Sequence, residues 1–222
     1  MQEIYDFMTN QQKTKYWICF ALMAIVLIAD QWLKIWVKTH MVIGEEINLI
    51  GDWCKLNFIE NDGMAFGFAF GGSAGKLLLT LFRLVASVAL VWLLLRQLKK
   101  NANYLLLISL SLIIVGAVGN LVDSCFYGVV FSESYPNVAV MFPQGGGYGT
   151  FLHGRVVDMF YFPLFEGVWP SWIPVVGGNS FEFFSAIFNL ADAAITMGVV
   201  LLIIDQIVVS RKTTEERTDV TE

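Results

Sequence analysis

The sequence has 222 residues, of which 56% are hydrophobic, and its mean hydropathy is +0.63. A soluble domain is usually about 45–50% apolar, and here the excess is gathered in four long runs without a polar face, which excludes a soluble helical bundle. The net charge of −5, with no basic stripe along the chain, excludes nucleic acid as a partner.

The four apolar runs predict four membrane-spanning helices, at about residues 17–39, 76–97, 104–126 and 183–208. Runs of roughly 20 residues or more are long enough to cross a hydrocarbon core of about 30 Å. Lys13 and Lys15 precede the first run as in a signal peptide, but no small-residue cleavage site follows. We therefore interpret the first run as a retained span.

Two substantial segments lie between the spans, at about residues 40–75 and 127–182, and a tail follows at about 209–222. The first segment mixes β-forming residues with glycine, which favours a small β element. The second is rich in glycine and in aromatic residues of the kind found at membrane interfaces. The predicted fold class is an all-α polytopic membrane protein, in one domain over residues 1–222, with a small extracytoplasmic β element and an interfacial loop or helix segment.

The basic residues near the span ends give the predicted orientation. They precede the first span, fill the connection between the second and third, and follow the fourth: Lys13, Lys15, Arg96, Lys99, Lys100, Arg211, Lys212 and Arg217. Basic residues gather on the cytoplasmic side of membrane proteins. Both termini are therefore predicted to be cytoplasmic, and both long segments extracytoplasmic.

Polar residues inside the predicted spans are costly and mark functional groups or their partners. Asp30 and Lys34 are four residues apart and share a helix face. Two further pairs are three apart, Asn120 with Asp123 and Asn189 with Asp192, and Asp158 lies in an apolar context outside the spans. A rise of about 1.5 Å per residue places the intramembrane acids in the outer half of the bilayer.

Carboxylates gathered at one depth in a low dielectric cannot all ionise freely, so that one of a close pair holds a proton. An aspartyl protease uses this state. From the residues alone, three readings stay open: a membrane enzyme based on carboxylates, a proton-coupled carrier of a lipid or amphiphile that uses Asp30, Asp123 and Asp192, and a membrane scaffold without catalysis.

Five short blocks in this chain resemble the pattern of the lipoprotein signal peptidases, also called type II signal peptidases. In order, the blocks are Asp30-Gln-Trp-Leu-Lys34, Asn61-Asp-Gly63-Met-Ala65-Phe66, Gly119-Asn120-Leu-Val-Asp123-Ser124, Val156-Val157-Asp158-Met159-Phe160 and Phe188-Asn189-Leu-Ala191-Asp192. They cover about residues 30–195, and the long form of the chain is similar to Bacteroidota-type members.

The resemblance implies an intramembrane aspartyl endopeptidase that cleaves diacylglyceryl-modified prolipoproteins just before the lipidated cysteine. Asp158 and Asp192 are the implied catalytic pair, and no metal or cofactor is implied. The site-supporting residues carried over from the blocks are Asp30, Lys34, Asn61, Gly63, Gly119, Asn120, Asp123, Asn189 and Ala191. The resemblance also implies a multi-pass protein of the bacterial inner membrane, with its site near the outer face. We expect a lipidated prolipoprotein and membrane lipid as partners, and a monomer.

The chain departs from the family pattern at two places. Ser124 stands where the family commonly has arginine, which leaves Arg155 or Arg83 as a substitute, or no substitute at all. The stretch from Asp123 to Asp158 is also longer than in compact members. Its inserted segment, residues 127–155, is interpreted either as a lid over the site or as a surface loop without a role in the reaction.

Overall fold

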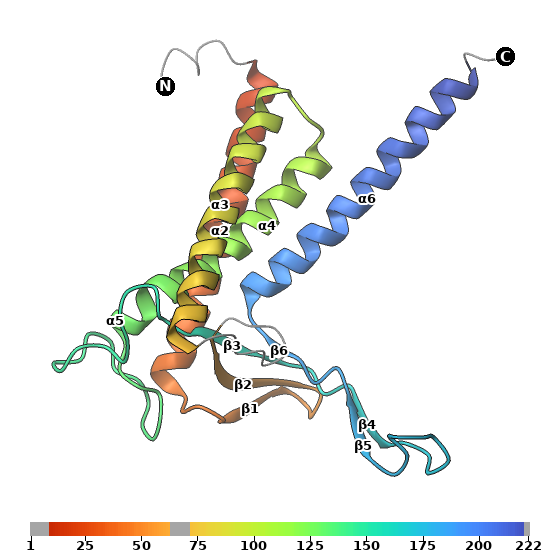
Figure 1. The fold of residues 1–222 in the computed structure, drawn as a ribbon. Coiled ribbons are helices and arrows are strands. Elements are labelled where there is room, and N and C mark those ends of the chain that lie inside the picture. The colour runs from red at the N-terminus through yellow and green to blue at the C-terminus, as the bar shows by residue number, and fades with distance from the viewer. Residues whose placement is uncertain (1–8, 63–71, 220–222) are drawn as a thin grey trace. The chain divides into compact units, whose positions relative to one another are not determined.

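The computed structural model describes residues 9–62 and 72–219. In this part of the chain, four helices are long and apolar enough to cross a membrane. This confirms the four predicted spans by length and composition (Figure 1). The helices are α2 (Asn10–His40), α3 (Gly72–Lys99), α4 (Tyr104–Val122) and α6 (Leu190–Asp219), and α4 continues through a π-helical turn, η2 (Asp123–Tyr127), into the short α5 (Gly128–Val130).

The chain divides into two compact units, which are described separately. We call the first the helical unit, formed by Met1–Gln31, Leu78–Leu121 and Leu190–Glu222. We call the second the strand unit, formed by Trp32–Leu77 and Val122–Asn189. The expectation of one membrane domain over residues 1–222 stays a prediction.

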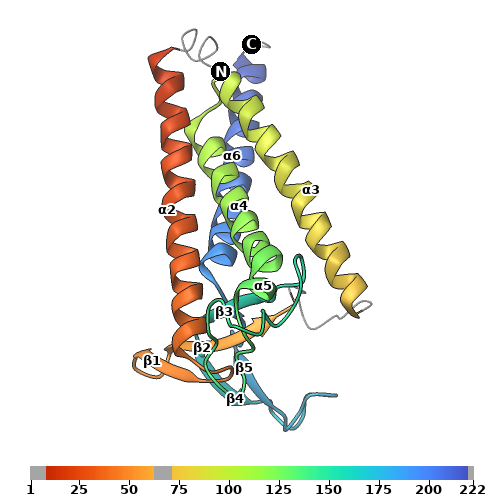
Figure 2. The same ribbon diagram turned by 90° about the vertical axis from the view of Figure 1, so that its left-hand side faces the viewer.

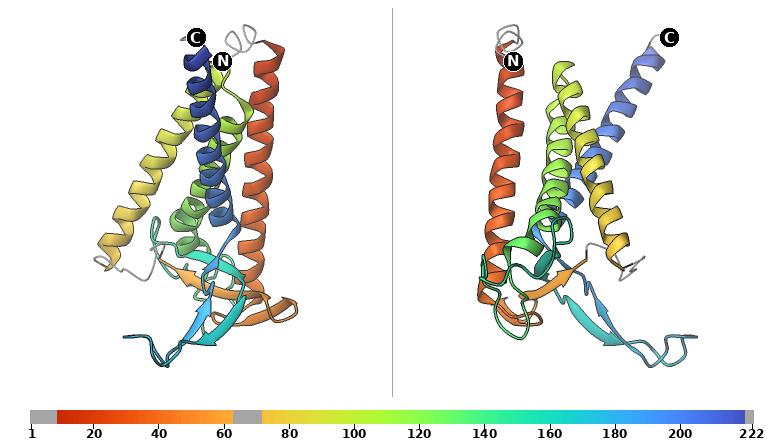
Figure 3. Two further views of the ribbon diagram at one scale, coloured as in Figure 1. Left: turned by 90° about the vertical axis from the view of Figure 1, so that its right-hand side faces the viewer. Right: turned by 60° about the vertical axis from the view of Figure 1, so that its left-hand side comes forward.

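The helical unit takes its residues from the four long helices (Figures 2 and 3). One core cluster of this unit joins α2, α3 and α4, and consists of Cys19, Leu94, Leu98, Leu107, Leu110 and Ile114. The contact between α4 and α6 depends on glycine. A Cβ atom added at Gly116 would lie 2.2 Å from the carbonyl oxygen of Ala191. Small residues allow membrane helices to approach this closely.

Gly116→Ala is therefore expected to destabilise the protein. The new methyl group meets backbone at Ala191 and the Ile195 side chain at 2.6 Å, so that the helices must shift apart. Overpacking of this kind costs about 1–3 kcal/mol. Thermal unfolding in detergent measures the change. Gly145→Ala is the matched control, because a Cβ atom there meets no atom within 4 Å, and equal unfolding temperatures for both variants would contradict the expectation.

The strand unit contains an antiparallel sheet in the order β1-β2-β3-β6 and a separate hairpin, β4-β5 (Figure 1). The strands are β1 (Glu46–Ile50), β2 (Cys54–Asn61), β3 (Val156–Tyr161), β4 (Phe165–Val168), β5 (Ser180–Phe183) and β6 (Ile187–Phe188). The small β element predicted for the first segment is confirmed. The second segment was expected to be loop or helix, and instead supplies β3, β4 and most of β5.

The start of the fourth span also differs from the prediction. Helix α6 begins at Leu190, whereas the apolar run was expected to be helical from residue 183. The intervening residues include β6, which pairs with β3 through Phe160 and Phe188. A short apolar run suits a buried strand as well as a helix, and hydropathy alone cannot separate the two.

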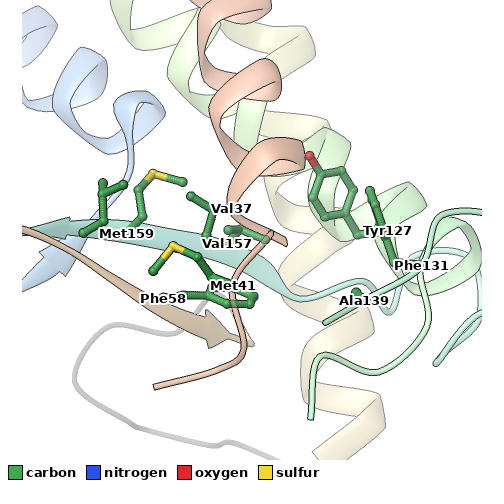
Figure 4. Packing of buried hydrophobic residues seen from close by; sticks show 9 residues of the cluster. Val37, Met41, Phe58, Tyr127, Phe131, Ala139, Val157 and Met159 are labelled. Atoms are coloured by element: carbon green, nitrogen blue, oxygen red, sulfur yellow. The ribbon is translucent and has the colours of Figure 1, made fainter. Parts of the chain in front are cut away.

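The core of the strand unit joins the end of α2 to the sheet (Figure 4). Val37 of α2 and Met41, which directly follows this helix, pack with Phe58 of β2 and with Val157 and Met159 of β3. Tyr127, Phe131 and Ala139 of the following segment belong to the same cluster. These contacts fix the strand on which Asp158 lies.

Candidate active site

Asp158 lies on β3 and is 2% exposed. Two amide side chains from distant blocks hold its carboxylate. Asn189 Nδ2 donates to Asp158 Oδ1 at 2.6 Å and also to the carbonyl oxygen of Val157 at 3.2 Å. Asn61 Nδ2, from the end of β2, donates to Asp158 Oδ2 at 3.4 Å. A buried carboxylate is costly unless donors of this kind satisfy it, so these contacts keep Asp158 at a defined position.

A buried ion pair lies next to this strand. Lys34 Nζ is 2.8 Å from Asp123 Oδ2, and both side chains are fully buried. The same Asp123 oxygen accepts a hydrogen bond from the backbone N–H of Val157 at 3.4 Å. Asp123 is the first residue of η2, and single π-helical turns inside helices are frequent at functional sites. The pair ties α2 and η2 to β3 one residue before Asp158.

Asp192 belongs to the helical unit, in the first turn of α6. Asn120 Nδ2 of α4 donates to Asp192 Oδ1 at 2.7 Å. A carboxylate in the first turn of a helix is favoured by the helix dipole. Asp192 is therefore held both by a side-chain amide and by the electrostatics of its own helix.

Asp30 contacts the start of α6 in the same unit. Its Oδ1 accepts a hydrogen bond from the backbone N–H of Ala191 at 2.9 Å. Its Oδ2 accepts from Gln31 Nε2, which also donates to the carbonyl oxygen of Gly119. A Cβ atom at Gly119 would lie 2.8 Å from Asp30 Oδ2. Asp30 thus satisfies an N–H at the helix start that lacks an intrahelical partner.

The predicted site residues therefore fall into two groups. The strand unit holds Lys34, Asn61, Asp123, Asp158 and Asn189, and the helical unit holds Asp30, Gly119, Asn120, Ala191 and Asp192. Gly63, also predicted to support the site, lies outside the described residues. Among residues 9–62 and 72–219, no group of three or more His, Cys, Asp or Glu side chains could hold a metal ion. The expectation of a reaction without metal or cofactor stays a prediction.

The residue at the position where the family commonly has arginine is buried. Ser124 is 2% exposed, and its carbonyl oxygen accepts a hydrogen bond from the Gly154 N–H at 2.9 Å. The guanidinium of Arg155, one of the two proposed substitutes, donates to Glu60 and to Glu133. Arg155 is thus a partner of two acids beside β3.

The sequence did not predict a second set of polar and charged contacts with a buried centre, which we call the Glu60 network. Its members are Lys38, Glu60, Glu133, Ser134 and Arg155. One signal could have found it: Asp30, Lys34 and Lys38 are spaced four apart along α2. This spacing places a third ionisable residue on the same face of the helix.

The sequence matches a family described as signal peptidase (SPase) II over residues 22–208. The lipoprotein signal peptidase of Porphyromonas gingivalis is 51% identical over 185 residues, which cover 83% of this chain and 80% of that protein. The lipoprotein signal peptidase of Amoebophilus asiaticus is 36% identical over 197 residues, covering 86% of this chain and 78% of that protein.

The fold is also similar to a solved structure of a bacterial membrane enzyme, determined by the in meso method at 1.9 Å resolution. The TM-score is 0.55 at 24% sequence identity, and the match covers 85% of this chain and 92% of that one. The likeness supports the fold alone. The family match covers most of the chain, and all five sequence blocks lie within it. This chain therefore belongs to the signal peptidase II family.

Proposed function

We propose that this chain is a membrane aspartyl endopeptidase that removes the signal peptide from diacylglyceryl-modified prolipoproteins, with Asp158 and Asp192 as its catalytic pair. The observation that carries the proposal is the setting of Asp158, a carboxylate 2% exposed on an apolar strand and held by Asn61 and Asn189. Because the chain belongs to the signal peptidase II family, the alternative that the intramembrane acids serve a proton-coupled carrier is not favoured.

The chemistry needs two carboxyl groups in different protonation states. One carboxylate acts as general base and takes a proton from the attacking water. The other, protonated, donates a hydrogen bond to the scissile carbonyl oxygen and then passes its proton to the leaving amine. Asn189 bonds Asp158 and precedes Asp192 by three residues in the sequence, so that one short stretch of chain serves both acids.

The remaining block residues are proposed to support the pair. Asn120 orients Asp192 through its 2.7 Å hydrogen bond. Lys34 and Asp123 brace β3, and Asp30 satisfies the N–H of Ala191. Gly119 is proposed to leave room for the Asp30 carboxylate and the Ala191 side chain, and Gly63 is also proposed as a supporting residue.

We also propose the setting in the cell: the bacterial inner membrane, with both termini in the cytoplasm and the active site near the outer face. The basic residues at the span ends support this orientation. The proposed partners are a lipid-modified prolipoprotein and the surrounding membrane lipid, with the enzyme acting as a monomer.

Cysteine labelling tests this orientation, because the native cysteines Cys19, Cys54 and Cys125 are all buried. In spheroplasts, an impermeant maleimide is expected to label Asp52→Cys, on the β1-β2 turn, before lysis. Lys100→Cys, between α3 and α4, is expected to react only after lysis. The reverse pattern would overturn the proposed orientation.

A gel-shift assay tests the activity itself. The purified protein, in detergent or lipid nanodiscs, is incubated with a diacylglyceryl-modified prolipoprotein. The product is expected to lose its signal peptide and to keep the lipidated cysteine at its new N-terminus, and an inhibitor of this peptidase family is expected to block the shift. Proton-driven transport without peptide cleavage would instead support the carrier reading.

A further inference from the structure

The Glu60 network joins three separate parts of the strand unit. Glu60 lies on β2, and its Oε1 accepts hydrogen bonds from Lys38 Nζ, at the end of α2, and from Ser134 Oγ at 2.7 Å. Its Oε2 accepts from Arg155 Nη1 at 3.0 Å. The Arg155 guanidinium also binds Glu133, with nitrogen–oxygen distances of 2.8 and 3.2 Å. Three of the five members, Glu133, Ser134 and Arg155, come from the 127–155 segment.

The centre of the network is buried, and its charges balance. The side chains of Lys38 and Glu60 are 0% and 2% exposed. Burial alone would raise the pKa of Glu60, but Lys38, Ser134 and Arg155 outweigh it and hold the pKa below its usual value. Glu60 is thus ionised at neutral pH. Lys38 and Arg155 supply two positive charges against the negative charges of Glu60 and Glu133. The side chains of Arg155 and Glu133, at the edge of the network, are 32% and 51% exposed.

The 127–155 segment is fixed by its backbone as well. The N–H groups of Tyr148 and Gly149 donate to the carbonyl oxygens of Phe131 and Gly128, at 2.9 and 2.8 Å. A Cβ atom at Gly147 would lie 2.1 Å from the Gly128 oxygen, and one at Gly154 would lie 2.0 Å from the Asp123 oxygen. No side chain fits at either glycine, so the backbone of the segment packs directly against its own start and against η2.

Side chains of the segment complete this attachment. The Tyr148 ring faces both cations, with Lys38 Nζ at 4.9 Å and Arg155 Cζ at 4.7 Å from its centre. Its hydroxyl accepts a hydrogen bond from the Arg155 N–H at 2.6 Å. Phe131 packs in the same core as Val157 (Figure 4). The segment is therefore continuous with the core of the sheet.

The Glu60 network is connected to Asp158 through the paired strands β2 and β3. Glu60 is followed by Asn61, which donates to Asp158. In the register of β2 with β3, Glu60 lies opposite Val157 and Asn61 lies opposite Val156. Arg155 directly precedes β3. A displacement of Glu60 or Arg155 therefore moves the ends of the two strands that place Asn61 and Asp158.

We propose that the 127–155 segment is a fixed brace for the strand pair β2-β3, and that Glu60 is a positioning residue for Asp158. This inference rests on the proposed catalytic role of Asp158. The brace differs from both earlier interpretations of the segment, since a lid moves with the reaction and a surface loop has no part in it. The Glu60 carboxylate connects the segment to the strands, because Glu60 lies on β2 and accepts hydrogen bonds from Ser134 and Arg155.

Glu60→Gln tests the role of this carboxylate. Glutamine has one acceptor oxygen where the carboxylate has two, so it cannot accept from Lys38 and Ser134 on one side and from Arg155 on the other. We expect kcat to fall by about 10- to 100-fold, because small displacements of reacting groups cost rates of this order, while KM changes little. The rate is measured on the lipidated prolipoprotein and expressed per active site, titrated with a tight-binding inhibitor, so that unfolded enzyme is not counted.

A second variant separates positioning from stability. Lys38→Met combined with Glu60→Gln removes one buried charge of each sign, so the unfolding temperature is expected to recover. The lowered kcat is expected to persist, because the second acceptor is still missing. Recovery of kcat together with stability, or wild-type kcat in both variants, would overturn the proposal. Glu46→Gln is the control, since Glu46 forms an exposed pair with Lys55 on the same sheet.

Hydrogen exchange distinguishes a brace from a lid. The amides of Tyr148, Gly149 and Gly154 are expected to be protected in the free enzyme and to gain no protection when the inhibitor binds. A large gain would overturn the brace in favour of a lid. Asp158→Asn in the same assay keeps the two proposals separate. If that variant is active, the assignment of Asp158 fails; if it is inactive while Glu60→Gln has wild-type kcat, only the brace fails.

Discussion

Asp158→Asn is expected to lower kcat for prolipoprotein cleavage by about 10²- to 10⁴-fold, the range over which positioned acids and bases act. The amide keeps the shape of the side chain, and its oxygen can still accept the bond from Asn189, which is 2.6 Å long in the parent protein. It cannot take or give the proton that the reaction moves. Initial rates in the gel-shift assay measure the loss, and an unchanged unfolding temperature shows that the variant is folded.

Asp192→Asn is expected to have an effect of the same size, for the same reason. If the two acids act as a unit, the double variant loses little more than either single variant, because residues of one catalytic group are not additive. Asp52→Asn is the matched control, an exposed acid on the β1-β2 turn that hydrogen-bonds Asn48. A wild-type rate in either single variant would remove that residue from the catalytic pair, and multiplicative losses would argue against a joint mechanism.

The helices were predictable because their signals are local. Helix α4 begins at the predicted residue, Tyr104, and the side chain of Asn103 just before it accepts a hydrogen bond from the Leu106 N–H at 2.8 Å. This is the usual N-cap contact of asparagine. The start of α6 was not predictable in this way, because the pairing partner of β6 lies on β3. No feature of residues 183–189 alone reveals that partner.

The candidate site shows the same division between local and distant signals. The spacing of Asp30 and Lys34 correctly suggested one helix face, yet Lys34 pairs with Asp123, which is 89 positions further along the chain. The Glu60 network has members from α2 to the residue just before β3, and it was not predicted. Such contacts depend on how the chain folds back on itself, and a single sequence carries no record of them apart from the cost of leaving buried charges unpaired.

The Lys34–Asp123 pair gives the largest expected effect on stability. Both side chains are fully buried, so Lys34→Met removes the ammonium group that neutralises the Asp123 carboxylate in the interior. Breaking a buried pair in this way costs about 3–5 kcal/mol. The backbone N–H of Val157 donates to Asp123 Oδ2 at 3.4 Å, and a hydrogen bond of this length cannot replace the ammonium group. Unfolding in a denaturing detergent series measures the free energy of unfolding.

Removal of both charges is expected to restore much of the lost stability. In Lys34→Met combined with Asp123→Asn, neither charge of this pair is left buried, and the amide oxygen can still accept the bond from Val157. Exposed pairs are worth about 0–1 kcal/mol, so Lys55→Met, which breaks the partly exposed pair with Glu46, is the matched control. If Lys34→Met were no less stable than this control, the pair would not hold η2 against β3. If the double variant regained stability but not activity, the ionised pair would have a role in the reaction beyond folding.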